Sequence, residues 1–191
     1  MSQETTKKKF FQLTVFDMAT IAVMTALICV VGPLSVPIGP VPIAFANLAI
    51  FLALYVLGWR NGTICVVLYI LIGMANLPVF SNFSGGLGKL AGATGGYIIG
   101  YIPMALIAGY FIEKKDNRII KIVAMVVSTI VLYTLGTIWF CAVTHNTVEA
   151  ALGLCVLPFI PGDLVKILLV SFVGDMIRQA LVRAGLLKHS R

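Results

Sequence analysis

Residues 119–143 read IIKIVAMVVSTIVLYTLGTIWFCAV, a stretch whose only charged side chain is Lys121. The hydrocarbon core of a bilayer is about 30 Å thick, and about 20 apolar residues in a helix cross it. This stretch therefore predicts a transmembrane helix. Over the whole chain 60% of the residues are hydrophobic and 11% are charged, against roughly 25% charged residues in soluble domains. Lipid must therefore solvate much of the surface.

Six runs of the chain are apolar enough for such helices, although the second and third are short. They are residues 15–31, 43–57, 63–77, 91–112, 119–143 and 158–182. A tight reversal is expected at 58–62, between the second and third runs. Because the runs follow one another closely, we predict a single transmembrane domain, 1–191, with an all-α fold of six membrane-spanning helices.

The positions of the basic residues test the count of six. Cytoplasmic loops of membrane proteins are enriched in Lys and Arg. With six spans, twelve of the fourteen basic residues lie on one side of the membrane, whereas five spans would put the C-terminal four on the other side. We therefore expect both termini in the cytoplasm, with a cytoplasmic N-terminal segment 1–13 and a cytoplasmic tail 183–191. The two exceptions, Lys89 and Lys166, fall in the outer half.

The net charge of +7 does not predict a nucleic-acid partner. Such binding needs a basic face on a folded domain, and here the basic residues separate apolar runs. Residues 83–90 resemble a phosphate-binding loop, but Phe83 and Leu90 stand where GxxxxGK[ST] requires glycine and a hydroxyl. A loose GxGxx[GA] match at 86–91 follows no strand of a βαβ unit. Any ATP hydrolysis must therefore take place in a partner chain.

A membrane hydrolase with Ser84 and His145 as its dyad is the one enzymatic alternative. A catalytic base must be held within hydrogen-bond reach of its partner, and His145 lies in a predicted outer loop. The four cysteines form no CxxC pair, and no cluster of His, Cys and acidic residues predicts a metal site. We expect a protein that is not an enzyme and that needs no metal and no cofactor.

Four charged residues lie inside the sixth run, and two of them are in the segment PGDLVK at 161–166. A charge in hydrocarbon costs about 2.5–3.5 kcal/mol or more, so an intramembrane charge predicts a functional site. Asp163 and Lys166, three residues apart, share a helix face and partly neutralise each other. The alternative is that Asp163 caps the helix and Lys166 snorkels outward. Asp175 and Arg178 repeat the spacing near the cytoplasmic end, where a structural role is favoured.

The outer segments have unusual composition. Residues 32–42, GPLSVPIGPVP, contain four prolines and no charge, which predicts a rigid non-helical loop that acts either as a lid or as a stiff connector. Glycines recur every fourth residue at 88, 92, 96 and 100 and share one face if this stretch is helical. Such a face allows tight helix packing or forms a backbone wall beside a ligand.

The first helix carries a second pattern of small residues, Ala22 and Ala26, four residues apart. Small residues at this spacing let two helices approach closely in a membrane. The face either packs within the chain, which is the default expectation, or docks on a helix of another membrane protein.

Three segments resemble the BioY family, the biotin-specific substrate-binding (S) components of energy-coupling factor (ECF) importers. They are LPVFS at 77–81, SGGLGKLAGATGGYIIGY at 84–101 and PGDLVK at 161–166, and the likeness in length and six-span topology covers nearly the whole chain. The chain departs from the family pattern at Ala93, where proline is usual, and at Asn82 and Phe83, where small residues are usual.

This resemblance implies an S-component-like bundle in the cell membrane that captures biotin at the outer face and delivers it inward. It also implies three partner chains, namely a coupling membrane protein and two ATPase subunits. The pair Ala22 and Ala26 matches the alanine motif with which S components dock on the coupling protein. The bilayer and biotin complete the set of expected partners.

Biotin combines a ureido group, which has two N–H donors and a carbonyl, with an apolar ring and a carboxylate tail. Asp163 is suited to accept from an N–H, and Lys166 to donate to the ureido oxygen or the carboxylate. Tyr97 offers a ring wall with a hydroxyl tip. The expected polar lining is completed by Thr94 and Asn82, with Lys89 at the rim facing the tail.

Two rival functions use the same segments. One is an S component for another vitamin, riboflavin or thiamin. The other is an autonomous secondary carrier driven by an ion gradient.

Overall fold

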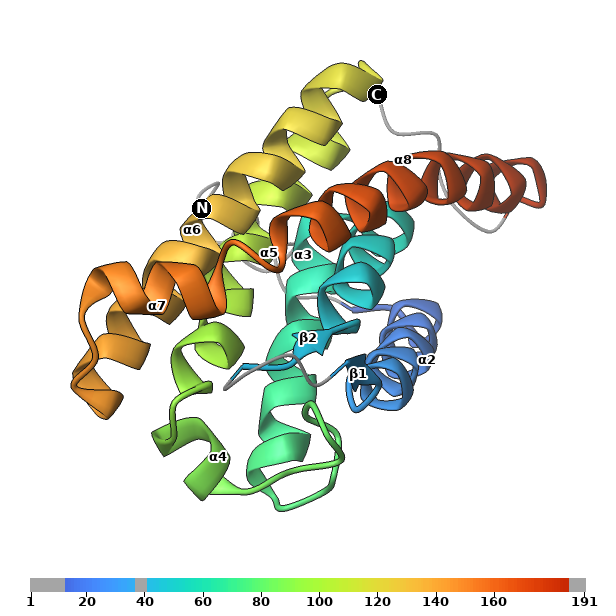
Figure 1. The fold of residues 1–191 in the computed structure, drawn as a ribbon. Coiled ribbons are helices and arrows are strands. Elements are labelled where there is room, and N and C mark those ends of the chain that lie inside the picture. The colour runs from blue at the N-terminus through green and yellow to red at the C-terminus, as the bar shows by residue number, and fades with distance from the viewer. Residues whose placement is uncertain (1–12, 37–40, 186–191) are drawn as a thin grey trace, which may run out of the picture.

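The computed structural model describes residues 13–36 and 41–185 (Figure 1). In this part of the chain the fold is helical, with one short two-stranded ribbon. The elements are α2 (Val15–Val31), β1 (Ser35–Val36), β2 (Ile43–Ala44), α3 (Ala46–Met74), α4 (Leu87–Ala91), α5 (Gly95–Lys114), α6 (Arg118–Thr144), α7 (Val148–Cys155) and α8 (Ile160–Arg183). Most of the predicted cytoplasmic segments, 1–13 and 183–191, lies outside the described residues.

The first predicted helix is confirmed with its bounds, because α2 covers 15–31. Thr14 caps it: the Thr14 Oγ1 accepts a hydrogen bond from the Asp17 backbone N–H at 3.1 Å, and Asp17 Oδ2 accepts from the Thr14 N–H at 3.0 Å. Two of the N–H groups that a helix start leaves free are satisfied in this way. The acidic side chain also complements the positive end of the helix dipole.

A sharp break at Gly58 divides α3 into two helical segments that lie side by side (Figure 1). The Gly58 φ of 78° lies in the left-handed region, which glycine enters without steric cost. The reversal is tight, because a Cβ at Gly62 would lie 3.1 Å from the Leu54 Cα. Glu113 at the end of α5 accepts a hydrogen bond from the Trp59 N–H at 3.0 Å. The predicted reversal at 58–62 is confirmed.

Helix α5 is the centre of the bundle, since it packs on both α3 and α6 while α2 packs on α3. Two glycines allow α5 and α6 to approach closely. A Cβ on Gly96 of α5 would collide with the Trp139 side chain of α6, and a Cβ on Gly136 of α6 would collide with the Tyr97 ring. Close approach of this kind is the membrane form of small-residue packing.

The predicted glycine face, in contrast, is interrupted. The chain leaves the helical conformation after Ala91 and begins α5 at Gly95, with Gly92 in an extended conformation between the two helices. Gly88 therefore lies on α4, where a Cβ would meet nothing within 4 Å. Only the C-terminal part of the glycine repeat serves helix packing.

The segments around the β ribbon and α7 also differ from the prediction. Residues 43 and 44, assigned to the second helix, pair as β2 with β1 in an antiparallel ribbon, and α3 begins only at Ala46. Residues 37–40 of the predicted lid or connector lie outside the described residues. Helix α7, which no apolar run predicted, follows α6 and precedes α8.

Among the described residues, α3, α5 and α6 are each long and apolar enough to cross a membrane. The pair α7 and α8, bent by 49° between the two helices, forms a fourth candidate. Helix α2 is apolar but shorter, at 17 residues. Many large apolar side chains on these helices face outward, such as Val23, Ile138 and Val165, as expected for a surface solvated by lipid.

The glycine contacts yield a stability prediction with an internal control. We expect Gly96→Ala to lower the free energy of unfolding by about 1–3 kcal/mol, because the new Cβ forces α5 and α6 apart. Gly88→Ala makes the same chemical change where the new Cβ meets open space. Its free energy of unfolding should stay within about 0.5 kcal/mol of that of the parent. The measurement is thermal unfolding of both variants in one detergent. Equal melting temperatures would contradict the packing role of Gly96.

Candidate substrate-binding site

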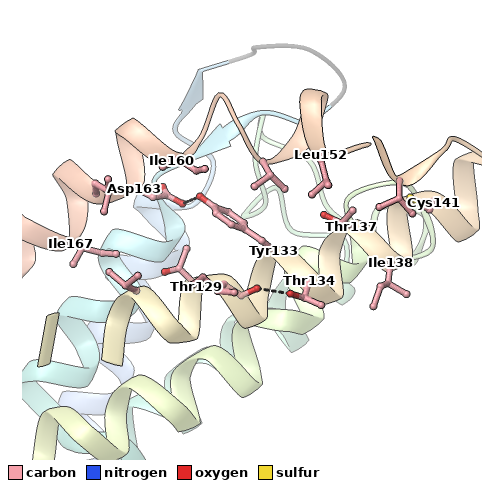
Figure 2. A pocket seen from close by; sticks show the side chains of 15 residues that line it. Thr129, Tyr133, Thr134, Thr137, Ile138, Cys141, Leu152, Ile160, Asp163 and Ile167 are labelled. Carbon is pink, nitrogen blue, oxygen red and sulfur yellow. Dashed lines mark hydrogen bonds between the residues drawn. The ribbon is translucent and has the colours of Figure 1, made fainter. Parts of the chain in front are cut away.

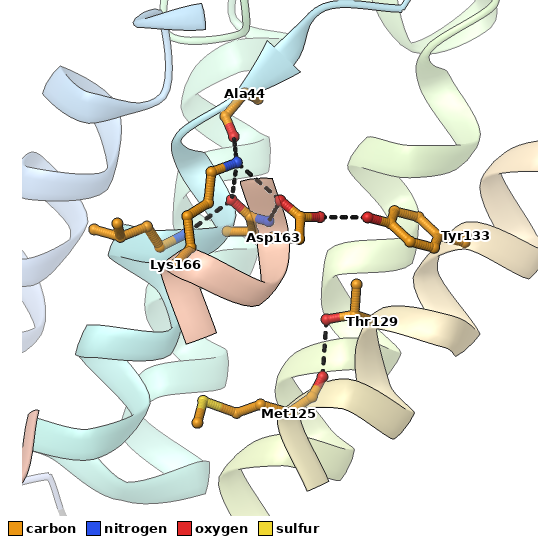
Figure 3. Close-up of polar contacts among 8 residues, drawn as sticks. Ala44, Met125, Thr129, Tyr133, Asp163 and Lys166 are labelled. Atoms are coloured by element: carbon orange, nitrogen blue, oxygen red, sulfur yellow. Dashed lines mark hydrogen bonds and ion pairs between the residues drawn. The ribbon is translucent and has the colours of Figure 1, made fainter. Parts of the chain in front are cut away.

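The two intramembrane charges form a buried ion pair at the start of α8 (Figure 3). The Lys166 Nζ lies 2.8 Å from the Asp163 Oδ1, and the two residues are only 6% and 7% exposed. Pro161 stands in the first turn of the helix, where its missing N–H costs nothing. Asp163 makes no capping hydrogen bond, and Lys166 does not reach the surface. The geometry therefore excludes the alternative of a capping acid and a snorkelling lysine.

Asn47, in the first turn of α3, joins the pair to a second helix. Its side-chain N–H donates to Asp163 Oδ1 at 3.0 Å, and its Oδ1 accepts from Lys166 Nζ at 3.4 Å. Lys166 Nζ also donates to the Ala44 carbonyl oxygen of β2 at 2.8 Å. The ammonium thus has three acceptors, which equals its number of N–H donors.

Tyr133 of α6 supplies the remaining contact of the carboxylate. Its hydroxyl donates to Asp163 Oδ2 at 2.6 Å, and this is the one hydrogen bond to Oδ2 among the described residues (Figure 3). Oδ2 is therefore the atom of the pair with the most capacity for a further donor. The cluster ties α3, α6, α8 and the β ribbon together at one point.

A small cavity of about 50 Å³ adjoins this cluster. Its walls combine aromatic and aliphatic side chains with the four polar groups described above. The lining residues are Val41, Pro42, Ile43, Ala44, Asn47, Tyr97, Tyr101, Leu132, Tyr133, Cys155, Phe159, Asp163 and Lys166. An apolar enclosure with a few convergent polar groups is typical of small-molecule sites.

The structure brings three of the six predicted ligand-binding residues to this cavity, namely Asp163, Lys166 and Tyr97. The Tyr97 ring lies in its wall, with the hydroxyl 3.4 Å from the Thr137 Oγ1. Within the described part of the chain, the other three predicted residues do not line the cavity.

Those three residues lie on the segment between α3 and α5. Asn82 has a left-handed φ of 60°, and its Oδ1 accepts from the Ser35 Oγ at 2.7 Å, which links this segment to β1. Thr94 is buried and precedes the first residue of α5. Lys89 on α4 is half-buried, and this desolvation lowers the pKa of its ammonium group.

A larger groove of about 490 Å³ lies on the other side of Tyr133, between α6 and the α7–α8 pair (Figure 2). Its walls are mostly aliphatic, with contributions such as Ile130, Leu152 and Ile167. Tyr133 and Asp163 line both the groove and the small cavity. The hydrogen bond between them therefore lies at the boundary of the two spaces.

Comparison with known proteins identifies the family. The family model described as "BioY family" matches residues 3–183. The chain belongs to the BioY family. It is similar to the biotin transporter BioY of Thermotoga maritima, with 36% identity over 80% of this chain and 89% of the relative. It is also similar to the biotin transporter BioY2 of Lactococcus lactis, with 31% identity over 88% and 91% of the two chains.

A solved structure agrees with this assignment. The chain is similar to the crystal structure of the S-component for biotin from an ECF-type ABC transporter, with a TM-score of 0.79 and 28% sequence identity. The match covers 94% of this chain and 95% of that one. This BioY-family chain is a multi-pass membrane protein of the cell membrane, and its relatives are transporters rather than enzymes.

The sequence interpretation did not single out Asn47, Tyr101 or Tyr133. Asn47 carried a usable signal, because it is the one amide in the apolar run 43–57 and polar groups in membrane helices need partners. The sequence around Tyr101 and Tyr133 carried no such signal, since tyrosines are common in apolar helices. The direction in which a tyrosine side chain points depends on how the helices pack.

Ala22 and Ala26 are both exposed on α2. The face they form with Val23 and Val30, which are 67% and 68% exposed, is not covered by any described part of this chain. The default expectation, packing within the chain, therefore does not explain this face.

The ion pair yields a test of its energetic role. Lys166→Met alone leaves Asp163 charged and buried, so we expect a loss of about 3–5 kcal/mol of unfolding free energy. The double variant Asp163→Leu/Lys166→Met removes both charges and should recover most of that loss. Lys114→Met at the exposed end of α5 is the control and should be near neutral. A double variant as unstable as the single one would show that the pair itself stabilises the fold.

Proposed function

We propose that this chain is the substrate-binding component of an ECF-type vitamin importer and that it captures biotin at the outer face of the membrane for delivery inward. The observation that carries the proposal is the buried Asp163–Lys166 pair beside a cavity with aromatic walls. Its relatives are biotin transporters, and the similar solved structure is an S-component for biotin. A buried ion pair is retained at a cost in desolvation, and recognition of a polar ligand accounts for its presence.

In this proposal the chain crosses the membrane six times, with both termini in the cytoplasm. The six spans are α2, the two segments of α3 on either side of Gly58, α5, α6 and the α7–α8 pair. The reversal at Gly58 and the sharp bend before α8 support this count. It places the ends of α5 and α8 with the loop before α6 on the cytoplasmic side, in agreement with their basic residues.

The ureido group of biotin matches the hydrogen-bonding capacity of the cluster. Asp163 Oδ2 has room for a ligand N–H, and Lys166 donates to the ureido oxygen or the carboxylate when one of its present acceptors is released. The rings of Tyr97 and Tyr101 provide walls for the fused ring system. Thr94, Asn82 and Lys89 are proposed as further polar contacts around the carboxylate tail, on the segment that leads from α3 to α5.

The volume of the cavity makes ligand binding a conformational event. Small-molecule pockets typically measure about 300–1,000 Å³, whereas this cavity measures about 50 Å³. A vitamin of the size of biotin must therefore displace part of the wall. The β2 strand, whose Ala44 carbonyl accepts from Lys166, and the Tyr133 ring, beside the larger groove, are the parts whose movement adds space.

Transport itself requires partner chains in this proposal. They are a coupling membrane protein, on which the exposed face of Ala22 and Ala26 docks, and two ATPase subunits. The likeness to an S-component of an ECF-type ABC transporter supports such an assembly. Binding of the vitamin needs no cofactor.

Asp163→Asn tests the site. We expect the affinity for biotin to fall about 10- to 100-fold, because the ligand N–H meets an amide and Lys166 loses its counter-charge. The measurement is isothermal titration of the purified protein in detergent with biotin, riboflavin and thiamin. Asp175→Asn, which removes the other acid of α8 outside the cavity, is the matched control and should bind biotin as the parent does. Unchanged affinity in Asp163→Asn, or tighter binding of another vitamin, would contradict the assignment.

Ala22→Trp tests the docking face. We expect unchanged biotin binding, because Ala22 is exposed and remote from the cavity, and a loss of ATP-dependent uptake in vesicles that contain the coupling protein and the ATPases. Leu106→Trp, which introduces the same side chain at an exposed position of α5, should keep uptake. Uptake by the parent chain alone, driven by an ion gradient, would instead identify a secondary carrier.

A further inference from the structure

We propose that this chain holds the headgroup of an anionic phospholipid in a second, polar cavity between the start of α6 and the end of α8. The cavity measures about 640 Å³ and lies far along α8 from the vitamin site. In Figure 1 the two helices diverge here, with α8 extending away from the bundle. The lining residues are Asp116, Arg118, Lys121, Asp175, Arg178, Gln179, Val182 and Arg183.

The base of this cavity is an ion cluster that joins α6 to α8. Lys121 Nζ lies 3.0 Å from Asp175 Oδ1, and Arg118 Nε lies 3.3 Å from Asp175 Oδ2. The Lys121 side chain is only 8% exposed, and its ammonium lies 5.4 Å from the centre of the Tyr55 ring. The sequence spacing pointed to an Asp175–Arg178 pair, but the described partners of Asp175 both come from α6. The carboxylate thereby holds two cations in fixed positions.

The charges of the cavity favour an anion. Four basic side chains line it against two acidic ones, and Asp175 is already bonded to two of the four. Within the described residues, neither Arg178 nor Arg183 forms an ion pair. Arg178 is half-buried and Arg183 is exposed, so both guanidinium groups are available to an incoming phosphate. The N-terminal end of α6 adds the positive end of a helix dipole.

The surroundings of the cavity identify the anion as part of a lipid. Large apolar side chains on both helices are exposed beside it, namely Ile119 and Val123 on α6 and Phe172 and Met176 on α8. The Arg118 guanidinium lies 4.5 Å from the centre of the Phe172 ring, at the boundary between the two kinds of surface. A phospholipid fits both surfaces, with its phosphate in the basic cavity and its acyl chains on these apolar side chains. Basic pockets between membrane helices on the cytoplasmic side are known to bind anionic headgroups.

The test compares lipid binding by variants that lose the same charge. Native mass spectrometry of the purified chain, titrated with phosphatidylglycerol or phosphatidylcholine, measures the fraction with bound lipid. We expect a preference for phosphatidylglycerol in the parent and about 30-fold weaker binding in Arg178→Gln/Arg183→Gln, since each basic residue near an anionic surface is worth about fivefold. Lys114→Gln/Lys115→Gln removes two exposed charges outside the cavity and should bind phosphatidylglycerol as the parent does.

Further variants and ligands separate the alternatives. Arg178→Lys/Arg183→Lys retains the charge and should retain most of the preference, and thermal unfolding of every variant in one detergent shows whether the fold is intact. An equal loss of phosphatidylglycerol binding in Arg178→Gln/Arg183→Gln and Lys114→Gln/Lys115→Gln would mean that the lipid is attracted non-specifically, and it would overturn the proposal. So would the absence of a preference over phosphatidylcholine. Competition by inorganic phosphate as effective as that by the lipid would assign the cavity to a free anion instead. Biotin binding does not enter these outcomes, so they are independent of the proposed transport function.

Discussion

The burial of Asp163 and Lys166, in a chain whose other spans are almost free of charge, constrains how the elements around them are arranged. Two ions removed from water lose several kcal/mol of hydration each, and mutual attraction offsets this only when the remaining hydrogen-bonding groups are also satisfied. The structure meets this condition with groups from three other elements, namely Asn47 on α3, Ala44 on β2 and Tyr133 on α6. The ion pair therefore requires that these elements meet at one point, and this part of the bundle is arranged around it.

The membrane class and most helix positions could be predicted because they depend on local sequence. The lengths of the apolar runs predicted α2 and the main part of α5, α6 and α8. The glycines at 58 and 62 lie at the ends of the predicted reversal, which the structure places at Gly58. The prediction failed where tertiary contacts outweigh hydropathy. Residues 43 and 44 are apolar enough for a helix but pair with β1, and the glycine repeat breaks near Gly92, where the carbonyl oxygen accepts a hydrogen bond from the Trp139 indole.

Of the polar cluster at the candidate site, the sequence predicted only the two charged residues. A charged residue in hydrocarbon demands an explanation by itself, so Asp163 and Lys166 stood out from their neighbours. Tyr133 lies in an apolar run where a tyrosine is unremarkable, and its contact with Asp163 spans 30 residues of sequence. The same limit applies to Asp175. Spacing within one helix pointed to Arg178, whereas the ion pairs form with α6, whose position relative to α8 is set by the tertiary fold.

Helix α8 thus carries two acid–base clusters with opposite properties, and their difference follows from donor counts. At the Asp163–Lys166 cluster every N–H of the Lys166 ammonium has an acceptor, so a ligand that accepts from Lys166 must release Ala44, Asn47 or Asp163. Release of Ala44 removes the bond from α8 to β2, and release of Asn47 removes a bond from α8 to α3. Occupancy of the cavity and the packing of α8 are therefore not independent. At the cluster around Asp175 two guanidinium groups, those of Arg178 and Arg183, have no described counter-charge, and an anion adds contacts there without breaking any. The Asp163–Lys166 cluster is suited to a ligand that changes the conformation, and the Asp175 cluster to a ligand that stabilises it.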